Sequence, residues 1–303
     1  MTETPTSTPA SSAPPIMRWW PWVLRTVWAT LPFTVGPLLD AGLVAHSRPV
    51  HLVGVALAWL TWAVGLLGTV VGHPIGLTAL RMMTPAVMGS AVWGARIGGL
   101  AAWRGGLGLA GATVVCAVVL SAETGEWAVD GPSYPNEARF ALRPPATLMG
   151  IVPLVSVVCT AALFTGPLLL AARSWVAGAM FTIVGLAIAT AGARSLHQLS
   201  RRFVVFVPAG FVLHDHLAIS EPVLFKRSVV ESISLAPADT DSLDLSAKAP
   251  GLAVEVRLHD KVEIARVAAD QRTAEVGSTA RFLIVPSRPG RVLAEARRRR
   301  YGP

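Results

Sequence analysis

The alternation of apolar and polar positions divides the chain at residues 194–202. Before this stretch, residues 174–193 carry no charge and are long enough to cross about 30 Å of hydrocarbon as a helix. The stretch itself carries three arginines and a histidine, and residues 203–207 then form a β-branched and aromatic run. The pattern predicts a last membrane span, a basic interface and the first strand of a β domain, in that order.

Apolar segments upstream predict further membrane-spanning helices. Pro32 and Pro37 predict a kink or an early end in the first of them, because proline cannot donate a backbone hydrogen bond. Arg81 and Arg96 make the third segment uncertain, since it spans only if both arginines reach opposite interfaces. The six predicted spans are residues 22–39, 50–71, 77–100, 105–121, 147–170 and 174–193.

The third segment decides on which side of the membrane the β domain lies. With six spans, eight arginines of the first 202 residues lie on the side of the termini and four on the other side. With five spans, each side carries six. Because cytoplasmic loops carry the excess of Lys and Arg, the sequence favours six spans in the inner cell membrane, with both termini cytoplasmic.

After residue 202 the periodicity becomes that of strands. A C-terminal helix closes the chain, with Ser287 as the candidate N-cap and with Arg291, Glu295 and Arg299 at i, i+4 spacing. Upstream, glycine, asparagine and four prolines in residues 122–146 predict a loop without a long helix. The predicted strands lie near residues 203–208, 211–214, 222–226, 229–235, 252–258, 261–267 and 279–285.

These segments predict a membrane all-α part of about six transmembrane helices, followed by a mainly β domain of about seven strands and one helix. Composition agrees, since 52% of the residues are hydrophobic and only 15% are charged. The net charge of +8 suits a protein beside anionic lipid, and we expect no nucleic-acid partner. The predicted domains are a disordered Pro/Ser/Thr-rich tail, a helical transmembrane domain, a basic juxtamembrane linker and a β domain, at residues 1–17, 18–193, 194–202 and 203–303.

Seven short strands closed by a C-terminal helix resemble the pleckstrin-homology-like (PH-like) fold of bacterial membrane proteins. The whole chain resembles an uncharacterised family of actinobacterial multi-pass proteins. The resemblance implies the architecture alone, because it brings no known activity and no site residues. The stretches that carry it are RPVHLV (48–53), GLTALR (76–81), VDGPSY (129–134), LRPPA (142–146) and SRRFVVFVPAGFVLHD (200–215).

Arg194, Arg201 and Arg202 are the candidate site residues. If the last span continues as a helix, Arg194, His197 and Arg201 share one face, and Arg202 completes a basic collar beside the membrane. Each such arginine contributes about 1 kcal/mol to the attraction for anionic lipid headgroups. Orientation and anchoring of the last span explain the same arginines without a binding role.

Two further polar clusters have some of the features of metal sites. The H-x-H motif at residues 214–216 could begin a zinc site if His259 and Asp260 folded toward it, but a polar turn explains it more simply. Residues 239–244 are similar to the start of a calcium loop, yet the central glycine and the final glutamate are absent. We therefore expect neither a metal nor a cofactor.

No motif joins a nucleophile to a base, so the sequence predicts no catalytic residues. The favoured function is that of a non-enzymatic membrane protein presenting a cytoplasmic PH-like module for a protein partner, for its own copies or for the membrane surface. The alternative is a small-solute transporter or channel, with a polar path through Asp40, Thr61 and Thr78. An intramembrane enzyme is the least favoured class.

Overall fold

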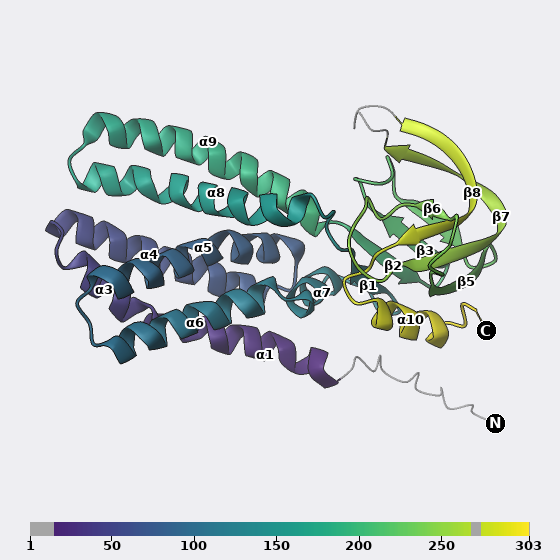
Figure 1. The fold of residues 1–303 in the computed structure, drawn as a ribbon, viewed down its shortest axis with the longest axis horizontal. Coiled ribbons are helices and arrows are strands. Elements are labelled where there is room, and N and C mark those ends of the chain that lie inside the picture. Colours follow the sequence, from purple (N-terminus) through teal and green to yellow (C-terminus); the bar gives the residue numbers. More distant parts are fainter. Residues whose placement is uncertain (1–14, 268–273, 303) are drawn as a thin grey trace, which may run out of the picture.

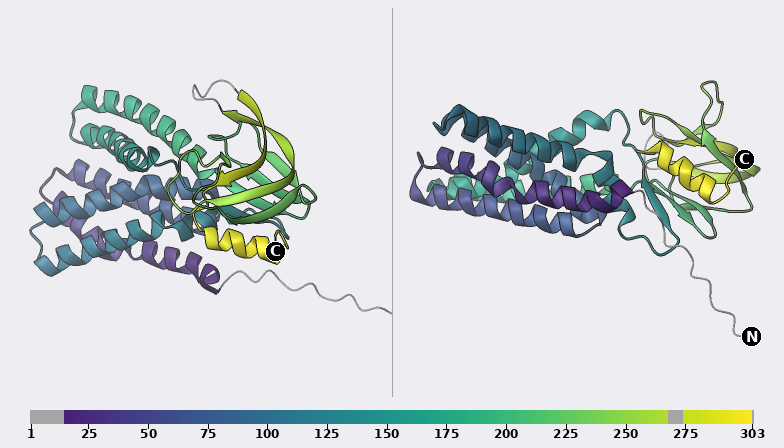
Figure 2. Two further views of the ribbon diagram at one scale, coloured as in Figure 1. Left: turned by 45° about the vertical axis from the view of Figure 1, so that its right-hand side comes forward. Right: turned by 90° about the horizontal axis from the view of Figure 1, so that it is seen from below.

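The chain folds into a helical bundle and a β domain that lie end to end (Figures 1 and 2). The computed structural model describes residues 15–267 and 274–302. The predicted disorder of residues 1–17 falls mostly outside the described residues, although residues 15–17 already belong to the first helix. The described part of the chain ends in the β domain (Figure 1).

Five helices within the described residues are long and apolar enough to cross a membrane, as expected of a multi-pass membrane protein. They correspond to the second to sixth predicted spans. The last of them continues through Ser200, so most of the predicted linker 194–202 is helical. The five are α4 (Arg48–Val70), α5 (Pro74–Ile97), α6 (Ala102–Leu120), α8 (Leu148–Ala171) and α9 (Trp175–Ser200).

The first predicted span is broken into three short helices. Pro32 and Pro37 lie in the first turns of the second and third of these, where a missing N–H costs least. The predicted kink is therefore confirmed. The broken segment still runs from the β-domain end of the bundle to the opposite end (Figure 1). Its helices are α1 (Pro15–Ala29), α2 (Leu31–Thr34) and α3 (Gly36–Leu43).

Helix α5, the least apolar of the five long helices, is also the most buried. It contacts α3, α4, α6, α8 and α9. Because protein surrounds it, the helix needs less hydrophobicity than one that faces lipid. Arg81 lies beside Gly125 near the β-domain end, and Arg96 is exposed near the other end of α5. Residues 77–100 have a weaker membrane-span pattern because they lie at the centre of the bundle.

Trp28 fixes the broken first segment to α4. Its side chain is fully buried, and its indole N–H donates to the Trp62 carbonyl oxygen at 2.9 Å. The ring fits over Gly65, where an added Cβ would overlap it. Close packing of a large ring on a glycine gives dispersion contacts that two flexible side chains would not make.

Residues 122–146, predicted as a loop, contain a helix and a strand. Helix α7 spans Ala122–Asp130, and the Ser121 hydroxyl caps it by accepting a hydrogen bond from the Thr124 amide at 3.2 Å. Strand β1 spans Ala138–Ala141 and pairs antiparallel with residues 203–206. The prediction of a loop was wrong at these two elements, and the β domain includes a strand from between two membrane helices.

Two four-stranded sheets form the β domain (Figure 1). The predicted strands 252–258 and 261–267 are one strand, β7, with an irregularity between Arg257 and Val262. The first sheet is antiparallel and contains β1, β2 (Phe203–Val207), β3 (Gly210–His214) and β4 (Val223–Lys226) in this order. The second contains, in this order, β5 (Val230–Leu235), β7 (Val254–Val267), β8 (Ala274–Ile284) and β6 (Leu243–Asp244), with β6 parallel to β8.

The core between the two sheets is aromatic and is closed by the C-terminal helix α10 (Pro289–Arg298). Val292 and Ala296 of this helix are fully buried in that core. The N-cap residue is Arg288, without a side-chain cap, so the prediction of Ser287 as the cap was wrong. The predicted pair of Glu295 with Arg299 is confirmed at 2.6 Å.

Candidate functional site

A bidentate ion pair fixes the point where α9 meets the β domain. Arg202 donates from Nε and Nη2 to the two carboxylate oxygens of Asp215, each at 2.7 Å. Its Nη1 donates to the Arg143 carbonyl oxygen at 2.9 Å, between β1 and α8. The two charged side chains are 1% and 0% exposed. The pair therefore joins the end of a membrane helix, the end of β3 and the segment before α8.

Because of this ion pair, the three arginines of the predicted collar, Arg194, Arg201 and Arg202, do not all face solvent. Arg194 and Arg201 are exposed at the end of α9. Arg202 points inward, and all of its nitrogens donate to Asp215 or Arg143, so its side chain is not accessible to a lipid headgroup. Headgroup binding by the two exposed arginines stays a prediction.

A polar hollow of about 180 Å³ opens between the end of α9 and the turn after β3. His214 is fixed in its wall, because its Nδ1 lies 2.9 Å from the Arg201 carbonyl oxygen and its ring stacks on Phe203. Burial lowers the pKa of His216, although the neighbouring Asp215 opposes this shift. The lining residues are Gln198, Arg201, His214, Asp215, His216, Ile219, Ser220 and Pro222.

The H-x-H motif does not gather further metal ligands. Within residues 15–267 and 274–302, no three His, Cys, Asp or Glu side chains are grouped so that they could hold a metal ion. His259 and Asp260 lie on β7, whereas His214 ends β3 in the other sheet. The arrangement gives no support to the zinc interpretation.

Glu255 accepts a buried set of hydrogen bonds in the second sheet. The hydroxyls of Thr240 and Ser242 and the Nε of Arg257 donate to it at 2.7, 2.5 and 2.6 Å. Burial raises the pKa of Glu255, but these donors outweigh burial and lower it from 4.5 to about 2. Two hydroxyl residues of the stretch 239–244, considered as a calcium loop, therefore bind a carboxylate of the fold.

A second ion-pair cluster joins α7 to the start of α10. Glu126 accepts hydrogen bonds from Arg288 at 3.2 Å and from Arg291 at 2.7 Å. Glu126 is 1% exposed, and burial raises its pKa although both arginines oppose the shift. The i, i+4 spacing predicted a pair between Arg291 and Glu295, but Arg291 binds an acid from between two membrane helices instead.

Polar residues considered for a transport path lie apart. Asp40 is 61% exposed at the end of the bundle far from the β domain, and it pairs with His51 at 2.9 Å. Thr61 donates to the carbonyl oxygen of Leu57 in its own helix. Thr78 donates to the Pro74 carbonyl oxygen at the opposite end of the bundle. Among the described residues, these side chains do not form one polar path.

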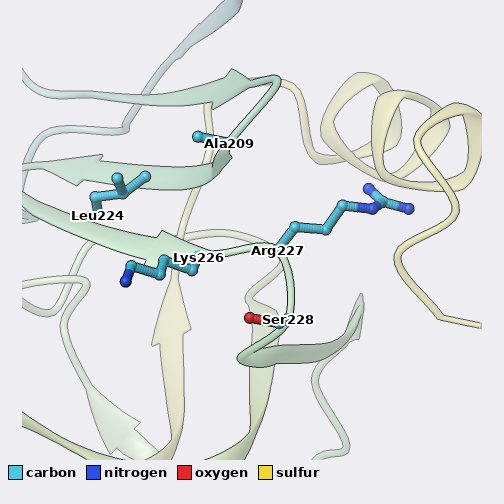
Figure 3. Close-up of a pocket in the computed structure, with 5 residues that line it drawn as sticks. All are labelled: Ala209, Leu224, Lys226, Arg227 and Ser228. Atoms are coloured by element: carbon cyan, nitrogen blue, oxygen red, sulfur yellow. The ribbon is translucent and has the colours of Figure 1, made fainter.

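A wide, open hollow lies on the outer edge of the first sheet. Figure 3 shows its lining side chains splayed around β4 and the turn that follows it. Arg227 points toward the C-terminal segment and lies over the Tyr301 ring at 4.8 Å, whereas Lys226 points the other way (Figure 3). The lining residues are Ala209, Leu224, Lys226, Arg227 and Ser228. The hollow is an open surface and not an enclosed site.

No family model, no curated protein and no solved structure matches the chain. The resemblance to actinobacterial multi-pass proteins therefore stays a prediction.

Proposed function

We propose that the protein is a non-enzymatic membrane protein that holds its β domain as a rigid binding platform for another protein at the cytoplasmic face. The integration of the β domain with the bundle supports this most. Strand β1, from between α6 and α8, pairs with β2, and Glu126 of α7 pairs with Arg288 and Arg291. A domain held at separate points of the chain presents its outer surface at a fixed distance and orientation from the membrane.

The proposed topology has six membrane crossings, with both termini in the cytoplasm of the cell. The broken segment α1–α3 supplies the first crossing, and the five long helices supply the others. An even number of crossings agrees with the start of α1 and the end of α9, which both lie at the β-domain end (Figure 1). The excess of arginines at this end is the reason for assigning it to the cytoplasmic side of the inner membrane.

The proposed fold of the β domain is PH-like. In support, one sheet has four strands, the other has three long strands, and a C-terminal helix closes the core. The two-residue strand β6 is a small addition to the second sheet. Strand β1 takes the place of the first strand, so the fold is complete only with residues from between two membrane helices.

Cysteine labelling in intact cells tests the topology, in a background with Cys116 and Cys159 replaced by alanine. Tyr134→Cys, at a position 72% exposed beside the β domain, is expected to resist a membrane-impermeant maleimide until the cells are permeabilised. Ser47→Cys, exposed between α3 and α4 at the opposite end, is expected to react in intact cells. The reverse labelling pattern would place the β domain outside the cell.

The open edge of β4 is the part of the platform proposed to bind the partner. Within residues 15–267 and 274–302, strand β4 pairs only with β3, so its other side presents backbone groups without a strand partner there. Leu224 is 47% exposed on this strand, and Lys226 and Arg227 beside it are exposed cations. Extended segments add to such edges through main-chain hydrogen bonds. The chemistry fits an extended, acidic segment of a protein.

Affinity purification of the full chain in mild detergent tests this surface. Leu224→Asp adds a negative charge at the edge and is expected to lower recovery of the bound protein about tenfold, by repelling an acidic segment. Leu235→Asp is the matched control, because Leu235 is 51% exposed on β5 in the other sheet. Equal recovery with both variants, measured by quantitative mass spectrometry, would contradict binding at β4. Recovery of only a second copy of the chain would reassign the edge to self-association.

A further inference from the structure

A polar hollow lies at the end of α9, where this helix meets the β domain. Helix α9 is one of the five helices long and apolar enough to cross a membrane, and it ends at Ser200. Gln198 and Arg201 at this end form one wall of the hollow. A helix that leaves the hydrocarbon passes directly through the layer of headgroups. The hollow is therefore within reach of the phosphate of a neighbouring lipid.

The side chains that line the hollow leave a net positive charge, because their one carboxylate is already paired with an arginine. Asp215 is the only carboxylate of the lining, and both of its oxygens already accept from Arg202. Arg201 is exposed, and within the described part of the chain its guanidinium has no hydrogen-bond or ion-pair partner. One unmatched cation thus remains at the mouth of the hollow, where an anion would provide its counter-charge.

The walls of the hollow are held in place before any ligand binds. His214 stacks on Phe203 with 4.6 Å between ring centroids and 5° between ring planes. On the other side, Ser220 donates from its amide and its hydroxyl to the Ala265 carbonyl oxygen at 2.9 and 3.2 Å. A site that needs no rearrangement loses little affinity to ordering.

We propose that this hollow binds the phosphodiester of an anionic phospholipid, with Arg201 as the cation that meets it. Soluble phosphate esters carry the same group, but the position at the end of a membrane helix favours the lipid. The proposal rests on the membrane placement of the proposed function and is independent of a protein partner. If the unchanged protein bound its partner but no anionic lipid, this inference alone would be overturned.

Native mass spectrometry of the full chain, with phosphatidylglycerol added to a neutral detergent, tests the proposal. Arg201→Gln is expected to weaken binding about tenfold, through loss of one charge-assisted hydrogen bond. Gln198→Trp fills the hollow without a change of charge, and it is expected to weaken binding to a similar extent. Arg194→Gln and Ser195→Trp are the matched controls, because both positions are exposed on α9 and neither lines the hollow. Both controls are expected to stay within about twofold of the unchanged protein.

Three outcomes would overturn the proposal. An equal loss with Arg194→Gln and Arg201→Gln, and none with Gln198→Trp, would show only general attraction between arginines and anionic lipid. Unchanged binding in all four variants would place the lipid elsewhere. Competition by glycerol phosphate at the same concentration as the lipid would assign the hollow to a soluble phosphate ester.

Discussion

Replacing Asp215 by alanine is expected to destabilise the β domain by about 3–5 kcal/mol, because it leaves a buried arginine without its counter-charge. The Arg202 side chain is 1% exposed, so its charge is almost fully removed from water. The substitution also removes the acceptor of the Leu217 amide, which lies 3.1 Å from the carboxylate. Hydrogen exchange of β2 and β3 amides in the full-length protein measures the loss. Exchange about a hundredfold faster or more is expected.

A double variant distinguishes the cost of an unpaired buried charge from the cost of lost packing. Arg202→Met combined with Asp215→Leu removes both charges and keeps apolar volume at the joint, so most of the stability is expected to return. A loss of about 1–3 kcal/mol remains, because the Arg143 carbonyl oxygen loses its donor and the Leu217 amide loses its acceptor. Unchanged hydrogen exchange in the Asp215→Ala protein would show that the ion pair does not hold the joint together.

Gly185→Leu in α9 is expected to separate the α8–α9 hairpin at a cost of about 3 kcal/mol. Helices α8 and α9 run side by side (Figure 1), and an added Cβ at Gly185 would collide with the Ala162 carbonyl oxygen. Gly178 meets the side chain and the backbone nitrogen of Leu170, and Gly192 meets the Cys159 side chain, both on α8. The contact at Gly185 is with backbone. Backbone atoms cannot move aside as a flexible side chain can, so the helices have to part. Titration with a denaturing detergent, followed by tryptophan fluorescence, measures the change.

The matched control for this substitution is Gly106→Leu in α6. No atom lies within 4 Å of an added Cβ at Gly106, so the same change of residue meets open space there. Its unfolding transition is expected to stay close to that of the unchanged protein. Equal transitions for the two variants would show that α9 does not depend on close contact with α8.

The long helices of the bundle could be predicted from local sequence, because each membrane-spanning helix has to meet the requirements of the membrane by itself. A helix in hydrocarbon satisfies its backbone internally, so length and apolar composition identify it without knowledge of its neighbours. Residues 50–71 and 174–193 met this rule and are helical. The third segment met it only weakly, because its surroundings are other helices, and no local pattern shows what surrounds a helix.

The contribution of residues 122–146 to the β domain could not be predicted from local sequence. Strand β1 is four residues long, and its partner β2 begins more than sixty residues later. A strand this short has no periodicity of its own, and pairing at such separation depends on the whole fold. The predicted division of β7 into two strands has a related cause, since the irregular pairing near residues 257–262 interrupts the alternation.

Arg202 shows the same limit at the candidate site. Beside Arg201 and at the end of an apolar helix, it has the sequence context of a residue that faces lipid headgroups. Its burial depends on Asp215, which directly follows β3 and accepts two hydrogen bonds from Arg202. Exposed Arg194 and Arg201 and buried Arg202 differ in their partners and not in their local sequence.

Local sequence was sufficient to predict the order of the parts: apolar helices, a basic junction, a β domain and a final helix. Each of these follows from composition and periodicity, which act over a few neighbouring residues. The tertiary structure alone decided that the β domain takes a strand and an acid, Glu126, from between two membrane helices. It also decided which arginine of the junction is buried. Both depend on contacts between residues distant in the chain, because buried charges and strand edges are satisfied by whatever the fold brings beside them.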